Sequence, residues 1–377
     1  MRLRNLVLLV ASILSIPAGK ASIYFSSNSD AGNQIVAVER NPVTGLLGNY
    51  TLFATGGNGA TAVNGAQAHA IAGTKRHLYV VNPGSDTFTT FAIRRNGLLD
   101  LLTTTPSGGR RPVSIALSGR RLFVANQGVT SESLAGSVQG FGVTTIGVPY
   151  IAGNATTYTA GESPSDVFFS RNGQRVFVLC TEGNTLDSYK LRRDGGLSET
   201  RDRLVLDGSP VGGSPMPLLP SGGAVALIKG VSSSVISFQS NAANRLFEIS
   251  SAIISTAVDP CWVTTSRSGR TLWTSNFEPT TLSQVQVFRG GALTYKNDTP
   301  ATAGPGSLDI EVSPCGRFLY RLRAFNSDGS GAPHPYPVLE VFRIQSNSLY
   351  GGLYLIQSKE IGEIALQSAA CTGLFIP

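Results

Sequence analysis

Residues 164–180 read PSDVFFSRNGQRVFVLC, and other segments of the chain repeat the pattern of this stretch. The clearest copies are PVSIALSGRRLFVAN (112–126), PCWVTTSRSGRTLWTSN (260–276) and SLDIEVSPCGRFLYRLR (307–323). A weaker copy begins at residue 66, and a degraded copy ends in PSGGAVALIKG (220–230). Each copy contains two runs rich in β-branched and aromatic residues, separated by a turn with glycine. This pattern predicts two antiparallel strands in each copy.

The turn glycines of five copies define the length of the repeat. They recur at intervals of 47 to 54 residues, at Gly119, Gly173, Gly222, Gly269 and Gly316. A third run with alternating polarity follows the copies, as in TLDSYKLRR (185–193), and a more variable fourth strand completes each unit. Four antiparallel strands that repeat every 45 to 50 residues or so are typical of a β-propeller blade.

The two ends of the chain supply one further blade. Residues 22–41, which include SIYFSSN and NQIVAVERN, match the second and third strands of a blade that lacks its first strand. The tail EIALQSAACTGLFIP (363–377) contains one apolar strand that is left over. We therefore predict an all-β fold, a seven-bladed β-propeller formed as a single domain by residues 22–377. The C-terminal strand would complete the first blade and close the ring, which hides the sheet edges.

The first 21 residues are typical of a secretory signal peptide. Arg2 and Arg4 precede an apolar core at 6–16 that is too short to span a membrane, and small residues end at Ala21. No later stretch reaches 18 apolar residues, so we expect no membrane span and a secreted, extracellular protein. In that compartment three sequons become candidate N-glycosylation sites, at Asn49, Asn154 and Asn297. We also expect the four cysteines to be oxidised at least in part.

Composition and charge exclude several classes of protein. Hydrophobic residues make up 41% of the chain and charged residues 14%, which excludes a disordered chain and a charged coiled coil. The formal net charge is +7, but the arginine doublets are dispersed at turns, so no basic stripe for nucleic acid is present. Only 3 histidines occur, too few and too scattered for a His-rich metal site. We expect a monomer without cofactor or metal.

One face of a propeller presents the starts of the first strands and the ends of the second strands around the central channel. We expect a small-molecule ligand there. The repeat places the following candidate ligand-binding residues on that face: Asn126, Lys229, Asn276, Asp309 and Arg323. The repeating asparagine is also explained simply as a turn residue that tolerates left-handed backbone. His69 lies at the start of a first strand and is a candidate catalytic residue, although a core histidine with satisfied hydrogen bonds is the simpler explanation.

Several motifs resemble those of the lactonase propellers, the group of bacterial 6-phosphogluconolactonase and fungal 3-carboxymuconate cyclase. The motifs are SRNG (170–173), SPCG (313–316), LYVVN (78–82), LFVAN (122–126) and NTLDSYKL (184–191). The resemblance covers the whole chain after the leader. It implies a His, a Glu and two Arg around the channel, which act on a small organic acid or lactone.

This chain departs from that set. Pro164-Ser165-Asp166 stands where the family has Pro-Arg-His, and Ser275-Asn276-Phe277 stands where it has Ser-Asn-Arg. The family's glutamate is matched by Glu182 only after a shift of one residue. Asp166 and Glu182 are therefore candidate catalytic groups that could form an acid–base pair from one blade, and ordinary strand-end carboxylates are the alternative.

Two classes of function stay open on these residues. The first is a secreted enzyme of the lactonase or cyclase type, and the second is a non-catalytic secreted propeller that recognises a small molecule, a glycan or a protein. The cysteines add one structural expectation. Cys315 lies on the first turn of the seventh blade and Cys371 lies in the tail strand beside it, so we predict that these two form a disulfide.

Overall fold

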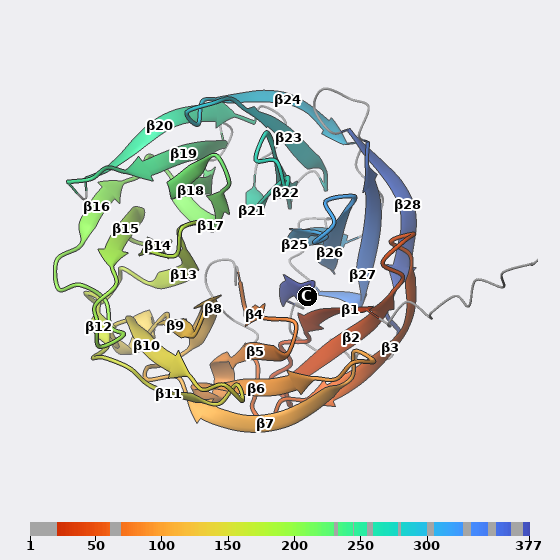
Figure 1. The fold of residues 1–377 in the computed structure, drawn as a ribbon, viewed down its shortest axis with the longest axis horizontal. Helices are drawn as coiled ribbons and strands as arrows, with labels where there is room; N and C mark the ends of the chain where they lie inside the picture. The colour runs from red at the N-terminus through yellow and green to blue at the C-terminus, as the bar shows by residue number, and fades with distance from the viewer. Residues whose placement is uncertain are drawn as a thin grey trace, which may run out of the picture.

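The computed structural model describes residues 21–60, 69–229, 233–243, 245–254, 259–277, 280–299, 305–326, 333–345, 352–362 and 372–377. In these residues, 29 strands form seven antiparallel sheets that stand around a central axis (Figure 1). Two single-turn 3₁₀ helices, η1 (Pro83–Ser85) and η2 (Thr130–Glu132), lie in connections between strands. The predicted seven-bladed β-propeller is confirmed.

We number the sheets as blades 1 to 7 in chain order. Blades 1 to 3 contain the following strands: in blade 1, β29 (Thr372–Phe375), β1 (Ala21–Ser26), β2 (Gln34–Arg40) and β3 (Leu47–Ala54); in blade 2, β4 (Ile71–Gly73), β5 (His77–Asn82), β6 (Thr87–Ile93) and β7 (Leu99–Pro106); in blade 3, β8 (Pro112–Ser118), β9 (Arg121–Asn126), β10 (Ser137–Val143), β11 (Pro149–Ile151) and β12 (Thr156–Thr157).

Blades 4 to 7 follow the same order. Their strands are, in blade 4, β13 (Pro164–Phe169), β14 (Arg175–Cys180), β15 (Thr185–Lys190) and β16 (Asp202–Val205); in blade 5, β17 (Ser209–Met216), β18 (Leu219–Ile228), β19 (Ser234–Ser240) and β20 (Leu246–Ile253); in blade 6, β21 (Pro260–Thr265), β22 (Thr271–Asn276), β23 (Leu282–Val287) and β24 (Leu293–Thr299); in blade 7, β25 (Pro305–Val312), β26 (Phe318–Asn326), β27 (Pro333–Ile344) and β28 (Leu353–Glu360). The first strand of each blade lies nearest the axis, and the fourth lies at the rim (Figure 1).

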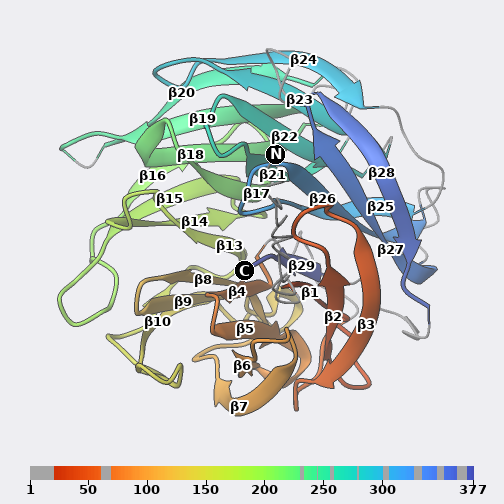
Figure 2. The same ribbon diagram turned by 45° about the vertical axis from the view of Figure 1, so that its right-hand side comes forward.

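The C-terminal strand closes the ring. β29 pairs antiparallel with β1, with Tyr24 opposite Phe375 and Phe25 opposite Leu374. Figure 2 shows β29 beside β1 near the centre of the ring. Blade 1 is therefore built from both ends of the described chain, as the sequence predicts, and the inner edge of β1 is covered.

The glycine turns fix each pair of first and second strands. In blade 4 the Ser170 hydroxyl accepts a hydrogen bond from the backbone N–H of Arg175 at 3.0 Å, and Gly173 has a φ of 66°. In blade 7 the Ser313 hydroxyl accepts from the N–H of Phe318 at 3.1 Å, and Gly316 has a φ of 71°. Residues other than glycine rarely adopt this left-handed conformation, which explains why glycine recurs at this turn.

The hydrophobic core lies between neighbouring blades. Phe177 of blade 4 packs edge-on against Phe238 of blade 5 with ring centroids 4.9 Å apart, and both side chains are fully buried. Burying one such side chain contributes about 1.5–3 kcal/mol to folding. Similar hydrophobic clusters join the other neighbouring blades. The apolar faces of the sheets therefore pack against each other, and polar side chains are left near the central axis.

Two expectations concern residues that the structure does not describe in full. Residues 1–20 and Cys371 lie outside the described residues, so the signal peptide and the Cys315–Cys371 disulfide stay predictions. Cys180 and Cys261 are buried and Cys315 is exposed on its turn, and none of these three is bonded to another described cysteine. None of the helices found in the described part of the chain has the length and apolar character needed to cross a bilayer.

Candidate functional site

A β-bulge recurs near the start of the first strands. The register shifts just after a proline in the following places: Pro112/Ser114 in blade 3, Pro164/Asp166 in blade 4, Pro210/Gly212 in blade 5 and Pro260/Trp262 in blade 6. Blade 7 has a corresponding shift between Ser307 and Asp309. A bulge changes the direction of the side chain that follows it. Ser114, Asp166 and Asp309 thus occupy equivalent positions in three blades.

Asp166 is where polar contacts from several blades meet. Its Oδ1 lies 3.0 Å from Nδ1 of His69 and accepts a hydrogen bond from the Ser114 hydroxyl at 2.8 Å. Its Oδ2 accepts a hydrogen bond from the backbone N–H of Gly213 at 3.0 Å. The Asp166 side chain is fully buried, so these donors from blades 3 and 5 and the histidine before β4 replace water around the carboxylate.

His69 reaches Asp166 from an unusual backbone conformation. Its φ is 53°, and its carbonyl accepts a hydrogen bond from the N–H of Ile115 at 2.9 Å, which holds the residue against β8. The side chain is 39% exposed, and its ring lies 6.4 Å from the ring of Phe168. Burial opposes the charged form, but the charge and hydrogen bond of Asp166, together with the charges of Asp309 and Glu311, outweigh it and raise the pKa of His69 to about 9. His69 is therefore an imidazolium at neutral pH.

Two carboxyl groups of β25 complete the polar cluster. Burial raises the pKa of Asp309 to about 7, although the positive charge of His69 lowers it in part. Burial and the neighbouring charge of Asp309 raise the pKa of Glu311 to about 8. Asp309 also accepts hydrogen bonds from the backbone N–H groups of Ile310, at 2.7 Å, and Leu374. Both carboxyl groups can thus exchange a proton near neutral pH.

His69 and Glu311 line a cavity of about 440 Å³. The other walls come mainly from turns that connect first and second strands, including Arg171 in blade 4, Arg267 in blade 6 and Pro314 in blade 7. This end of the channel is opposite to the face on which the sequence predicted a ligand. His69 precedes β4, which is only three residues long, and its backbone lies against the middle of β8.

Of the predicted catalytic residues, the structure brings together His69 and Asp166 but not Glu182. Glu182 is exposed in the turn after β14 and accepts a hydrogen bond from the Thr130 hydroxyl at 3.2 Å. The contacts of Asp166 go to other residues. The proposed pairing of Asp166 with Glu182 is therefore not observed among the described contacts, and His69 takes that place beside Asp166.

The two predicted cationic ligand-binding residues already have acidic partners. Arg323 is 1% exposed, and its Nη1 lies 2.9 Å from Oε1 of Glu340. Arg321 binds the other oxygen of Glu340, with Nε to Oε2 at 2.6 Å, so both arginines share one buried carboxylate. Lys229 forms an ion pair of 2.9 Å with Asp207. The role of Arg323 and Lys229 in ligand binding stays a prediction, and these contacts favour structural ion pairs.

Asn126 and Asn276 are fully buried at the ends of their second strands. The Asn126 amide donates to the Ser137 hydroxyl at 3.2 Å. The Asn276 amide donates to the Thr281 hydroxyl at 2.8 Å and the Ser283 hydroxyl at 2.7 Å. Each amide thus ties a second strand to the following strand, which is the turn role that the repeat also suggested. Their assignment to a ligand stays untested.

All three sequon asparagines are exposed. Asn49 lies on β3, Asn297 lies on β24, and Asn154 lies between β11 and β12. Glycosylation of these residues stays a prediction.

Sequence reasoning missed three residues of the cavity. Glu311 lies two residues after Asp309 on the same strand, so the period of two along a strand could have placed both on one face. Arg171 and Arg267 hold the same position in the turns SRNG and SRSG. The repeat shows this equivalence, but the sequence did not indicate that the turns surround a cavity.

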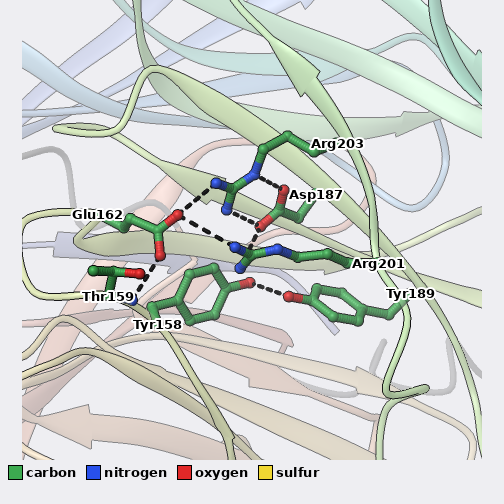
Figure 3. Close-up of polar contacts among 7 residues, drawn as sticks. All are labelled: Tyr158, Thr159, Glu162, Asp187, Tyr189, Arg201 and Arg203. Carbon is green, nitrogen blue, oxygen red and sulfur yellow. Dashed lines mark hydrogen bonds and ion pairs between the residues drawn. The ribbon is translucent and has the colours of Figure 1, made fainter.

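A second polar cluster lies between blades 3 and 4 (Figure 3). Arg203 binds Asp187 through two parallel contacts of 2.6 and 2.8 Å, and it also pairs with Glu162 on the segment that leads into β13. The hydroxyls of Tyr158 and Tyr189 lie 2.9 Å apart. The charges in this cluster neutralise one another, so we assign it a structural role in joining the two blades.

Within the described residues, no group of three or more His, Cys, Asp or Glu side chains is arranged to hold a metal ion.

Comparison with known proteins agrees with this architecture. The family model "Lactonase, 7-bladed beta-propeller" matches residues 24–135. No curated protein sequence matches the chain. Among solved structures, the periplasmic gluconolactonase of Pseudomonas aeruginosa is 19% identical, with a TM-score of 0.71 over 95% of this chain and 99% of the other.

Two further structures are similar over most of their length. A protein from Lactobacillus plantarum is 16% identical, with a TM-score of 0.68 over 95% of this chain and 99% of the other. A hypothetical selenium-binding protein from Sulfolobus tokodaii is 12% identical, with a TM-score of 0.66 over 96% of this chain and 94% of the other. At these identities the likeness shows the fold and does not extend to the activity.

Proposed function

We propose that this seven-bladed β-propeller is of the lactonase type and that it binds a small organic acid or lactone in the central channel. The observation that carries this proposal is the contact between His69 and Asp166 beside a cavity of about 440 Å³. Cavities of roughly 300–1,000 Å³ with a few convergent polar groups are typical of small-molecule sites. Ionisable groups with displaced pKa values often mark such sites.

The same groups suit the opening of a lactone. The ionised carboxylate of Asp309 or Glu311 would accept a proton from water as the water oxygen attacks the lactone carbonyl carbon. The imidazolium of His69 would donate a hydrogen bond to the carbonyl oxygen while negative charge develops there. The ring C–O bond then breaks, and the protonated carboxyl group returns the proton to the alkoxide that leaves. The products are balanced as one hydroxy acid from one lactone and one water.

A non-catalytic binding protein is the second candidate, and one observation favours it. Because its pKa is about 9, His69 holds both ring protons at neutral pH and has no lone pair to act as a base. The channel could then hold a ligand through a fixed cation and hydrogen bonds without converting it. We further propose that the protein acts outside the cell as a monomer, and the exposure of all three sequon asparagines supports the extracellular part.

Assays on a panel of lactones test this proposal. The purified protein would be mixed with glucono-δ-lactone and with a phosphorylated lactone, and both binding and hydrolysis would be followed. We expect binding of the plain lactone that is lost in His69→Gln and retained in Asp207→Asn, a carboxylate change outside the cavity. Hydrolysis faster than the spontaneous rate would show that the protein is an enzyme. Binding without hydrolysis would favour the binding protein. Equal binding by wild type and His69→Gln would contradict the channel site.

A further inference from the structure

The cavity has a strongly cationic rim that neither the proposed chemistry nor the family motifs use. Arg171 and Arg267 both line it and are both exposed to solvent. They occupy the second position of two equivalent glycine turns, in blades 4 and 6, and blade 5 lies between them. Two like charges at one opening repel each other, and an anion between them would relieve that repulsion.

The partners of these two arginines leave hydrogen-bonding capacity at the rim. Arg267 donates one hydrogen bond, from Nη1 to the carbonyl of Pro314 at 2.9 Å, which positions its planar group against the turn of blade 7. Within the described part of the chain, the Arg171 side chain takes part in no ion pair or hydrogen bond. A guanidinium carries five N–H donors, so most of the donors of this pair remain for a ligand.

The acidic groups around the cavity do not cancel this positive charge. Glu311 is the acidic residue among the described lining residues, and its pKa of about 8 keeps it mainly protonated at neutral pH. Asp166 is not among the lining residues, and it pairs with His69, which carries the compensating positive charge. At neutral pH the wall therefore has two guanidinium groups at the rim and an imidazolium farther in.

We propose that Arg171 and Arg267 form an oxyanion receptor at this rim, and that the ligand carries a carboxylate or phosphate there while its uncharged part lies against His69. The inference rests on the proposed small-molecule function of the channel and specifies the ligand class and the end by which it enters. Guanidinium groups bind carboxylate and phosphate through paired, charge-assisted hydrogen bonds. The low dielectric of a partly enclosed cavity strengthens such contacts relative to bulk water.

Titration calorimetry with three probes tests the receptor. Gluconate supplies a carboxylate, inorganic phosphate supplies a phosphate, and glucono-δ-lactone is a neutral compound of similar size. The variants are Arg171→Gln, Arg267→Gln and the double change, and Arg289→Gln is the matched control. Arg289 is an exposed arginine in the turn between β23 and β24, outside the cavity, so its loss changes the net charge equally.

We expect gluconate or phosphate to bind wild type and Arg289→Gln with similar affinity. Each single rim variant should weaken that binding by about tenfold or more, because one charge-assisted contact is lost, and the double variant should weaken it further. Stronger binding of gluconate than of phosphate would identify a carboxylate ligand, and the reverse order a phosphate. The affinity for the neutral lactone should change little in any of these variants.

Three results would overturn the receptor. One is equal affinity of wild type and the double variant for both anions. Another is a loss of anion affinity in Arg289→Gln that equals the loss in the rim variants. Binding of the neutral lactone, when neither gluconate nor phosphate binds, would also overturn the receptor. In that case the proposed function of the channel would still stand if His69→Gln abolished the binding of the lactone. Failure of all three probes to bind wild type would reject both the receptor and the channel function.

Discussion

Asp166 accounts for the raised pKa of the channel histidine. Its buried carboxylate contacts Nδ1 of His69, and its charge is the main influence that favours the imidazolium. Asp166→Asn keeps the shape of the side chain but removes this charge, while burial continues to oppose protonation. We expect the pKa of His69 to fall from about 9 by about 1 to 3. NMR titration of the imidazole measures this change.

Asp207→Asn is the control for that titration, because Asp207 is exposed and pairs with Lys229 away from the cluster. The His69 pKa should be unchanged in this variant. A His69 pKa that stays near 9 in Asp166→Asn would show that another group supplies the charge.

The residues of the site were predictable only in part. His69, Asp166 and Asp309 follow from the repeat, because equivalent positions of a propeller return to the same distance from the axis. Their mutual contacts do not follow, because they depend on the left-handed backbone at His69 and on the bulge before Asp166. Glu182 was proposed as the partner of Asp166 because both belong to one blade, but its described contact is with Thr130 and that of Asp166 is with His69.

At the scale of the element, the Arg203 contacts join the segment before β13 to the outer strands of blade 4. Arg203→Met would leave the fully buried Asp187 with only the longer contact to Arg201, 3.4 Å from Nη1 to Oδ2. Loss of a partner from a buried ion pair lowers the free energy of unfolding by about 3–5 kcal/mol. Because Arg203 is partly exposed, we expect Arg203→Met to lower it by about 2–3 kcal/mol. Denaturant unfolding measures this loss.

Arg192→Met is the matched control, since Arg192 pairs with the exposed residues Asp194 and Glu199. We expect it to cost less than about 1 kcal/mol. A similar loss of stability in both variants would contradict the structural role of the cluster in Figure 3.

The strand β29 has more influence than its four residues suggest. Removal of residues 372–377 would expose the edge of β1 and withdraw the Leu374 N–H from the Asp309 carboxyl group. Unpaired strand edges favour association between molecules, so we expect an aggregated product. Size-exclusion chromatography distinguishes this from a monomer, and removal of Pro377 alone is the control. A monomeric truncated protein with the melting temperature of the parent would contradict closure by β29.

At the scale of the whole molecule, the channel cluster should make stability depend on pH. The folded-state pKa values of Asp309 (about 7), Glu311 (about 8) and His69 (about 9) all lie above their ordinary values. The folded protein therefore binds more protons than the unfolded chain, and stability falls as pH rises. The stability that protonated Asp309 and Glu311 contribute is lost as pH rises from about 4 to 8. The stability that protonated His69 contributes is lost as pH rises from about 6.5 to 9.

We therefore expect the melting temperature to be higher at pH 5 than at pH 9. Glu311→Gln should reduce this dependence of the melting temperature on pH. Glu248→Gln should not, because Glu248 is an exposed glutamate on β20. Melting curves across this pH range provide the comparison. A melting temperature that rises from pH 5 to pH 9 would show that the cluster is not protonated in the way described.

The architecture of the whole molecule was the most predictable level. Repeated turns with glycine, alternating strands and an unpaired tail strand determine seven blades and their closure, because each feature is local and recurs. The functional end of the channel was not predictable in this way. It depends on which turns come together around a cavity, and the equivalence of the turns in the repeat does not show this.

The central claim is that the His69–Asp166 pair in the channel is the ligand site, and NMR observation of the histidines tests it most directly. The chain has only 3 histidines, and His69→Gln assigns the resonance in question. On titration with glucono-δ-lactone or gluconate, we predict a saturable shift of the His69 imidazole signals while those of His77, which lies outside the cavity, stay in place. Saturable binding that leaves the His69 signals unchanged would contradict the claim.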